Sequence, residues 1–172
     1  CNNCQLSCSV DPKEMFDDYL YVSSTSKQFV QHFEKAAKKY VQLFNLDNDS
    51  VLVDIGSNDG IALKPMKAFG VKVLGVEPAV NLAKLANDNG LKTINSYFND
   101  DVISQIQDQY GKVDLVTASN VFAHSDKLKE ITNNVFKVLK HNGVFIIEVQ
   151  YLVDTISSLT FDNIYHEHVN FW

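Results

Sequence analysis

VLVDIGSNDG, residues 51–60, passes from a short apolar run into a polar loop flanked by Gly56 and Gly60. An apolar run that ends in glycine is typical of a strand buried in a parallel sheet. Glycine also allows the backbone to approach a ligand closely. We therefore interpret this stretch as the first strand and the ligand-binding turn of an α/β domain.

Apolar runs and helix-like segments alternate along the rest of the chain. Further strands are predicted at 71–78, 92–98, 113–122 and 144–149. Helices are predicted at 25–45, 62–70, 79–90, 100–111, 126–143 and 152–159. Ser24 or Ser26 can cap the first helix, and Gly143 is expected to end the fifth. This order predicts an α/β fold with a doubly wound, mostly parallel sheet covered by helices on both faces.

The glycine loop differs from the dinucleotide fingerprint, whose three glycines let a pyrophosphate rest on a helix N-terminus. Asn58 stands at the second glycine position of that motif, and Asp59 follows it. An acidic loop repels a pyrophosphate but suits S-adenosylmethionine, which carries an ammonium and a sulfonium. Asp54 precedes the turn and can receive the amino group. We therefore expect four residues to bind this cofactor: Asp54, Gly56, Asn58 and Gly60.

The ends of the later strands are expected to complete the cofactor site. Glu77, followed by Pro78, lies about 20 residues after the glycine loop, where a carboxylate accepts hydrogen bonds from ribose hydroxyls. A solvated carboxylate at a strand end is the alternative. Tyr97 or Phe98 can stack on the adenine, with core packing as the alternative. The fourth strand ends in the sequence SNVFAH, and its residues Asn120 and His124 are expected to face the methionine end or the acceptor. The histidine can instead cap the following helix.

Charge and hydropathy exclude several classes of function. The net charge of −6 and the absence of a Lys/Arg cluster argue against a nucleic-acid partner, because phosphate contacts require a basic face. No apolar run approaches the ~20 residues that span a bilayer, which argues against a membrane partner. No signal peptide is visible, so a cytoplasmic location is expected. The sequence leaves the oligomeric state open.

All three cysteines lie in the first eight residues. Cys1 and Cys4 form the sequence CNNC, which has the spacing of two zinc ligands. A structural zinc site needs four ligands, and Cys8 has no second partner nearby. We therefore predict one half of a zinc site whose other ligands lie upstream. Reduced thiols in an irregular terminus are the alternative.

Five segments in this order, VDIGSNDG, LGVEPA, SNVFAH, IIEVQYL and FDNIYHEHVNFW, resemble the sugar C-methyltransferases. The resemblance covers nearly the whole chain, including CNNC and EMFDDYLYVSSTS. It implies a class I S-adenosylmethionine-dependent methyltransferase core with a Rossmann-like fold at residues 24–172. It also implies that residues 1–23 are the remnant of a zinc-binding module and linker, and that a C-terminal domain is missing. The implied substrate is a nucleotide-linked 4-keto deoxysugar.

Methylation of a carbon beside a ketone requires a base that removes the acidic C–H proton, and a histidine with a near-neutral pKa suits this role. A tyrosine hydroxyl can stabilise the enolate oxygen. The resemblance assigns the base to His168, with Tyr165 as donor and Glu167 as orienting carboxylate. It also implies a tyrosine from the YLYVSS segment, and we select Tyr21 over Tyr19.

The paired histidines of YHEH allow other interpretations. In an extended segment His166 and His168 would share a face, so a metal pair or two structural histidines are alternatives to a base. The spacing differs from H-E-x-x-H, which excludes a metalloprotease. Two further hypotheses concern the whole chain: an O- or N-methyltransferase of another small molecule, and a cofactor-binding module without catalysis.

Overall fold

The computed structural model describes residues 3–172 and is built around a five-stranded sheet with the order β4-β3-β2-β5-β6. Every neighbouring pair of strands is parallel. The strands are β2 Val51–Ile55, β3 Lys72–Glu77, β4 Thr93–Asn95, β5 Val113–Ser119 and β6 Leu139–Glu148. The chain reverses its direction of winding between β2 and β5, and ligands of such sheets bind at the carboxyl ends of the strands near this point. The predicted doubly wound α/β architecture is confirmed.

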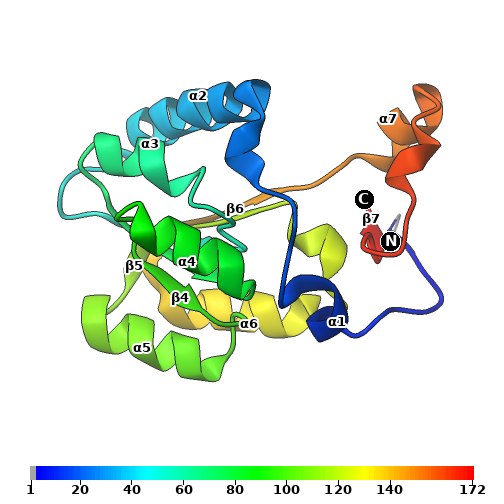
Figure 1. The fold of residues 1–172 in the computed structure, drawn as a ribbon. Helices are drawn as coiled ribbons and strands as arrows, with labels where there is room; N and C mark the ends of the chain where they lie inside the picture. Colours follow the sequence, from blue (N-terminus) through cyan, green and yellow to red (C-terminus); the bar gives the residue numbers. More distant parts are fainter. Residues whose placement is uncertain (1–2) are drawn as a thin grey trace.

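Helices cover both faces of the sheet, with α2, α3 and α4 on one side and α5 and α6 on the other (Figure 1). Their bounds are α2 Lys27–Phe44, α3 Leu63–Ala68, α4 Val80–Asp88, α5 Asp100–Tyr110 and α6 Leu128–Val138. The hydroxyl of Ser26 accepts a hydrogen bond from the Phe29 N–H at 3.3 Å, as one of the two predicted caps of α2.

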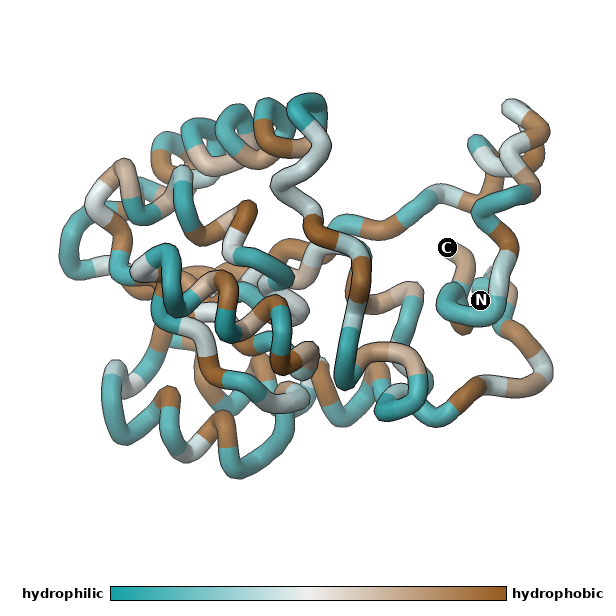
Figure 2. Tube along the Cα trace, in the orientation of Figure 1, coloured by the Kyte–Doolittle hydropathy of each residue, from teal (hydrophilic) through white to brown (hydrophobic). Residues whose placement is uncertain are grey.

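The pleat of β2 divides the core into two layers, because successive side chains point to opposite faces. Val53 and Ile55 pack with α5 and α6, whereas Leu52 packs with α2 and α3. Asp54 follows the alternation and points to the same face as Leu52. Figure 2 shows hydrophilic residues on the outer turns of α2 and hydrophobic residues turned toward the sheet.

The fifth predicted helix ends earlier than expected. α6 stops at Val138, and the residues from Leu139 to Glu148 form β6, so Gly143 lies in a strand. Pairing with β5 explains this, because Leu139 lies opposite Val113 and the ladder resumes after an irregularity. A Cβ on Gly143 would come within 3.0 Å of the backbone of Lys140, so the close approach of these two segments requires glycine.

The two ends of the chain meet beside the sheet domain. β1, Cys4–Gln5, pairs antiparallel with β7, Asn170–Phe171, and Figure 1 shows this pair near α7, away from the helical layers. The remaining elements are short: α1 Pro12–Phe16, α7 Leu152–Ser157, and the 3-10 helices η1 Ser23–Thr25, η2 Phe122–His124 and η3 Phe161–Asn163. Within residues 3–172, every helix falls short of the length and apolar character needed to cross a membrane.

Candidate active site

The glycine loop lies at the carboxyl end of β2 and bends back over the end of β3. The N–H groups of Gly56 and Ser57 both donate to the Val76 carbonyl, at 2.8 and 3.2 Å. Gly56 and Gly60 have φ values of 66° and 85°, and a Cβ on either would collide with a neighbouring side chain. Asn58 also has a positive φ of 52°, a conformation that asparagine tolerates better than most residues. The loop therefore makes a tight turn that requires glycine at both of its ends.

Two buried carboxylates lie at this edge. Asp54 accepts a hydrogen bond from the Thr117 hydroxyl at 2.6 Å, and burial followed by the nearby Glu77 charge raises its pKa to about 7. Glu77 accepts hydrogen bonds from the backbone N–H groups of Asn58 at 2.8 Å and Ala79 at 2.9 Å. Desolvation raises the pKa of Glu77 although these two bonds act in the opposite direction. Glu77 is only 5% exposed, so it is not a freely solvated strand-end carboxylate.

The glycine loop contains two buried polar atoms that have no hydrogen-bond partner among the described residues, Ser57 Oγ and Asp59 Oδ1. Buried polar atoms of folded proteins are nearly always satisfied, and exceptions are concentrated where a ligand or water binds. The acidic loop thus retains hydrogen-bonding capacity beside Glu77.

Residues 17–25, which we call the strap, link α1 to α2 across this edge and form the blue segment that rises toward α2 in Figure 1. The Asn58 amide holds the strap from below: its Nδ2 donates to the Tyr21 carbonyl at 3.0 Å, and its Oδ1 accepts from the Ser23 N–H at 3.0 Å. Asp59 accepts from the Ser24 N–H at 3.3 Å. The predicted cofactor loop is therefore covered by a segment more than thirty residues earlier in the chain.

The histidine cluster gathers residues from two segments that are distant in the sequence. His168 is 3% exposed, and its ring centroid lies 4.4 Å from that of Tyr165 and 5.0 Å from that of His124. The His168 Nδ1 lies 2.7 Å from the Asn163 carbonyl oxygen. Because a carbonyl can only accept, Nδ1 carries the proton and Nε2 of the neutral ring keeps its lone pair. His168 is thus prepared to accept a proton at Nε2.

His124 is held in a similar way, because its Nδ1 lies 3.0 Å from the Glu167 carbonyl oxygen. Desolvation, with the neighbouring His168 as the second cause, lowers its pKa to about 4. The ring is therefore neutral near pH 7. His124 makes this contact rather than capping α6, whose first turn has no side-chain cap.

The tyrosine that reaches this cluster is Tyr19, whose hydroxyl donates to Glu167 Oε2 at 3.0 Å. The residue selected from the sequence, Tyr21, is 50% exposed and contributes its backbone carbonyl to Asn58. Alternation in the YLYVSS segment gives both tyrosines the same face, so the sequence alone could not separate them. The contact with Glu167 is long-range and leaves no local signal.

The YHEH motif forms a turn rather than the extended segment assumed for a histidine pair. The His168 N–H donates to the Tyr165 carbonyl at 3.0 Å, which closes the turn. His166 is exposed, whereas His168 is buried. The two rings therefore occupy different environments, which removes the geometric basis for a shared metal.

The remaining predicted cofactor residues follow β3, β4 and β5, and they differ in their burial. Phe98 packs in the hydrophobic core with α5 and α6, which favours the core-packing alternative over adenine stacking. Its neighbour Tyr97 is partly buried, and its hydroxyl donates to Asp17 of the strap at 3.0 Å. Pro78 is partly buried after β3, and its carbonyl accepts from Asn95 at 2.7 Å. Asn120 follows β5 with a φ of 58°.

The predicted half zinc site falls partly outside the described residues, because Cys1 is not among them. Cys4 and Cys8 are exposed free thiols, and Cys4 belongs to β1. Within residues 3–172, no three His, Cys, Asp or Glu side chains are grouped closely enough to hold a metal ion.

Comparison with known proteins agrees with this fold. Residues 29–172 match the family described as "Methyltransferase domain". C-methyltransferase NovU of Streptomyces niveus is 36% identical over 163 residues, which cover 95% of this chain and 39% of that protein. The chain thus spans about two-fifths of the length of this curated relative.

Solved structures show the same fold at low sequence identity. A SAM-dependent methyltransferase from Archaeoglobus fulgidus has a TM-score of 0.65 at 20% identity, over 81% of this chain and 61% of that one. The plantazolicin methyltransferase BpumL, solved with a triazolic desmethylPZN analog and SAH, has a TM-score of 0.62 at 15% identity, over 80% of this chain and 54% of that one. The expected class I methyltransferase fold is confirmed. From the match over residues 29–172, the chain belongs to the methyltransferase-domain family.

Proposed function

We propose that this chain is the core of an S-adenosylmethionine-dependent C-methyltransferase that acts on a nucleotide-linked 4-keto deoxysugar. The family match and a relative named as a C-methyltransferase support the reaction class. The observation that carries the proposal is the buried His168, whose Nδ1 proton is held by the Asn163 carbonyl and whose Nε2 is left as a base. A base beside the acceptor is what carbon methylation needs and simple transfer to an oxygen or nitrogen does not always need.

The residues at the carboxyl edge fit S-adenosylmethionine. Glu77 would accept hydrogen bonds from the ribose hydroxyls, and Asp54 would face the ammonium group. Gly56, Asn58 and Gly60 would surround the methionine end, where the orphaned Ser57 and Asp59 atoms offer further hydrogen bonds. Two more residues are proposed at the rim, Pro78 and Asn120, and Phe98 packs in the core. When bound, the cofactor supplies an electrophilic methyl group.

The first chemical step is the removal of a proton from the carbon beside the ketone. His168 Nε2 takes this proton, and the electrons of the broken C–H bond pass into an enolate. The enolate carbon then forms the bond to the methyl group, and the sulfonium carbon–sulfur bond breaks with its electrons on sulfur. His168 afterwards returns its proton to solvent.

Hydroxyl donors stabilise the enolate oxygen in this scheme. Burial, followed by the Glu167 charge, raises the pKa of Tyr165, so its hydroxyl stays protonated at neutral pH. Burial and Glu167 likewise raise the pKa of Tyr19. Glu167 orients the Tyr19 hydroxyl through their 3.0 Å hydrogen bond, and neutral His124 packs against His168. We propose Tyr165 as the donor to the enolate and Glu167 as the orienting carboxylate.

The test is exchange of solvent deuterium into the carbon beside the ketone of a dTDP-4-keto sugar, measured in the full-length protein with S-adenosylhomocysteine bound. Wild type should incorporate deuterium at that carbon. His168→Ala should lower both exchange and methyl transfer by at least about a hundredfold, the usual contribution of a general base. Its affinity for the cofactor should stay within a few fold of wild type.

His166→Ala is the matched control, because His166 is exposed and lies only two residues away. It should retain nearly full turnover. Wild-type turnover in His168→Ala would contradict the base assignment. Methyl transfer to a sugar hydroxyl, without deuterium at carbon, would favour an O-methyltransferase, and the absence of both would favour a non-catalytic module.

A further inference from the structure

Tyr19 depends on its surroundings for its position. Residues 17–22 have no helix or strand assignment, so the backbone of Tyr19 lacks the hydrogen bonds of a regular element. Its hydroxyl nevertheless reaches Glu167, 148 residues later in the chain, at 3.0 Å. A flexible segment holds a side chain in one place only if other groups fix its backbone.

The side chain of Asn81 bonds both backbone polar groups of Tyr19. Its Nδ2 donates to the Tyr19 carbonyl at 2.9 Å, and its Oδ1 accepts from the Tyr19 N–H at 3.4 Å. A carboxamide has the donor and acceptor that complement both polar groups of a single peptide residue. Among the described residues, Asn81 is the one side chain that bonds the Tyr19 backbone.

Asn81 is itself attached to a rigid support. It lies in the first turn of α4, which is anchored by the buried side chains of Leu82, Ala83 and Ala86. This turn lacks a side-chain cap, and the Asp17 carbonyl of the strap accepts from the Val80 N–H at 3.1 Å instead. The strap and the start of α4 therefore satisfy each other's backbone groups.

The same turn also holds the predicted ribose carboxylate, because the Ala79 N–H donates to Glu77 at 2.9 Å. From Glu77 to Asn81, five consecutive residues connect the cofactor site to the backbone of Tyr19. The contact to Glu77 and the contacts to Tyr19 are therefore attached to the same end of α4.

We propose that Asn81 is a positioning residue: by gripping the backbone of Tyr19 it keeps the Tyr19 hydroxyl on Glu167, beside His168. This inference rests on the proposed function for its effect on turnover. Asn81 touches neither the predicted base nor the predicted cofactor residues through its side chain, so it acts through Tyr19 alone.

The experiment compares three variants of the full-length protein. Asn81→Ala removes both contacts. Asn81→Asp removes only the donor to the Tyr19 carbonyl, and its negative charge in the first turn favours α4 through the helix dipole. Asn89→Ala is the matched control, because Asn89 is also exposed, follows the end of the same helix and bonds only the Leu85 carbonyl.

Both Asn81 variants should lower kcat about tenfold, the effect of losing one hydrogen bond that positions a reacting group, while the KM for S-adenosylmethionine stays within a few fold. Hydrogen exchange of the peptide that contains residues 17–22 should accelerate in both. The Tyr19 pKa should fall toward its ordinary value in Asn81→Ala. Tyrosine absorbance titration measures this change, and Tyr19→Phe identifies which part of the signal belongs to Tyr19. Asn89→Ala should match wild type in all three measurements.

Several results would overturn the inference. Full turnover in Asn81→Asp with a loss in Asn81→Ala would indicate that the residue serves only to stabilise α4. If Asn81→Ala changed neither the backbone hydrogen exchange of residues 17–22 nor the Tyr19 pKa, the Asn81 contacts would not hold the strap in place. If wild type methylates no keto sugar, the proposed function fails, and the exchange and titration experiments still decide the role of Asn81 because neither requires turnover.

Discussion

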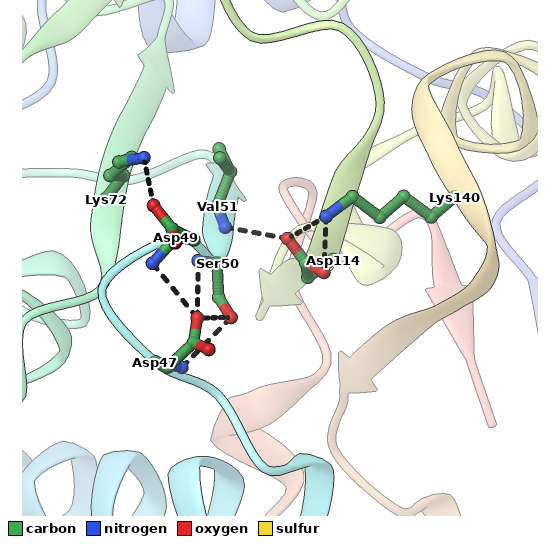
Figure 3. Close-up of polar contacts among 7 residues, drawn as sticks. All are labelled: Asp47, Asp49, Ser50, Val51, Lys72, Asp114 and Lys140. Carbon is green, nitrogen blue, oxygen red and sulfur yellow. Dashed lines mark hydrogen bonds and ion pairs between the residues drawn. The ribbon is translucent and has the colours of Figure 1, made fainter.

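The amino and carboxyl edges of the parallel sheet both carry acidic side chains, but the surroundings of these side chains differ between the two edges. At the amino edge, Asp114 accepts from the Val51 N–H at 2.9 Å and pairs with Lys140 at 2.8 Å (Figure 3). Asp49 pairs with Lys72 in the same region, and Asp47 accepts from the Ser50 hydroxyl. These carboxylates have cations or backbone N–H groups as partners and remain in contact with solvent.

At the carboxyl edge, Asp54 and Glu77 are buried and take part in none of the ion pairs among the described residues. Their pKa values are raised, mainly by desolvation. A buried carboxylate without a cation costs free energy that a ligand with an ammonium or hydroxyl groups can recover. The comparison teaches that the carboxylates of the amino edge stabilise the fold, whereas the carboxyl edge keeps two buried carboxylates without a cation, as the proposed ligand site requires.

The largest expected effect concerns Glu77, because its loss should damage binding far more than any change at the amino edge. Glu77→Ala should weaken binding of S-adenosylmethionine and S-adenosylhomocysteine about a hundredfold, the value of two hydrogen bonds to a charged group. Calorimetric titration measures this directly, with NAD as the ligand that wild type should not bind.

Glu77→Gln is the control for folding. Its side-chain carbonyl can still accept a hydrogen bond from one of the two backbone N–H groups that donate to Glu77. It should fold as wild type and still bind the adenosyl ligands more weakly. Equal affinity of wild type and both variants would place the ribose elsewhere and would break the contrast between the edges.

The contrast also shows what the sequence can predict. Strands and glycine turns are local signals, so the alternation of apolar runs and helical segments was enough to predict the sheet and to place Asp54 and Glu77 at strand ends. The C-terminal end of α6 was predicted at Gly143, but the helix ends earlier because Leu139 pairs with Val113 of β5. The register of a distant strand is not contained in a helical pattern.

The strap and the histidine cluster were harder to predict, because they depend on contacts between distant segments. Asn58 was expected to contact the cofactor, yet its side-chain amide binds Tyr21 and Ser23 of the strap. The sequence favours Tyr21, whereas the tyrosine hydroxyl that contacts Glu167 is that of Tyr19. The turn at Tyr165 to His168 likewise replaced an extended segment and buried only one of the two histidines.

A smaller effect is expected in the pH dependence of stability, through Asp54. Its folded pKa of about 7 lies above the ordinary 3.8, so the folded protein binds this proton more tightly than the unfolded chain. The contribution of Asp54 is therefore full below about pH 4 and is lost as the pH rises toward 7. Asp54→Asn should remove most of this pH-dependent decline in the free energy of unfolding over the window.

Denaturant titrations of the ligand-free protein at several pH values measure this difference. Glu77, whose pKa is also raised, is present in both proteins, so the comparison isolates Asp54. The Thr117 hydroxyl can still donate to the amide carbonyl that replaces the Asp54 carboxylate in the variant, which keeps the local packing intact. Parallel curves for the two proteins would mean that Asp54 titrates normally and is not held ready for a cation.

The smallest effect belongs to the amino edge and tests the other half of the comparison. Asp114→Ala leaves the N–H of the buried Val51 without its acceptor and should lower the free energy of unfolding by about 1 kcal/mol. Asp114→Asn keeps that acceptor and loses only the half-exposed pair with Lys140, so it should cost about 0.5 kcal/mol or less. Neither variant should alter cofactor affinity. A loss of affinity in either one would show that the two edges are coupled through β2 and β5, and the division between a stabilising edge and a ligand-binding edge would no longer hold.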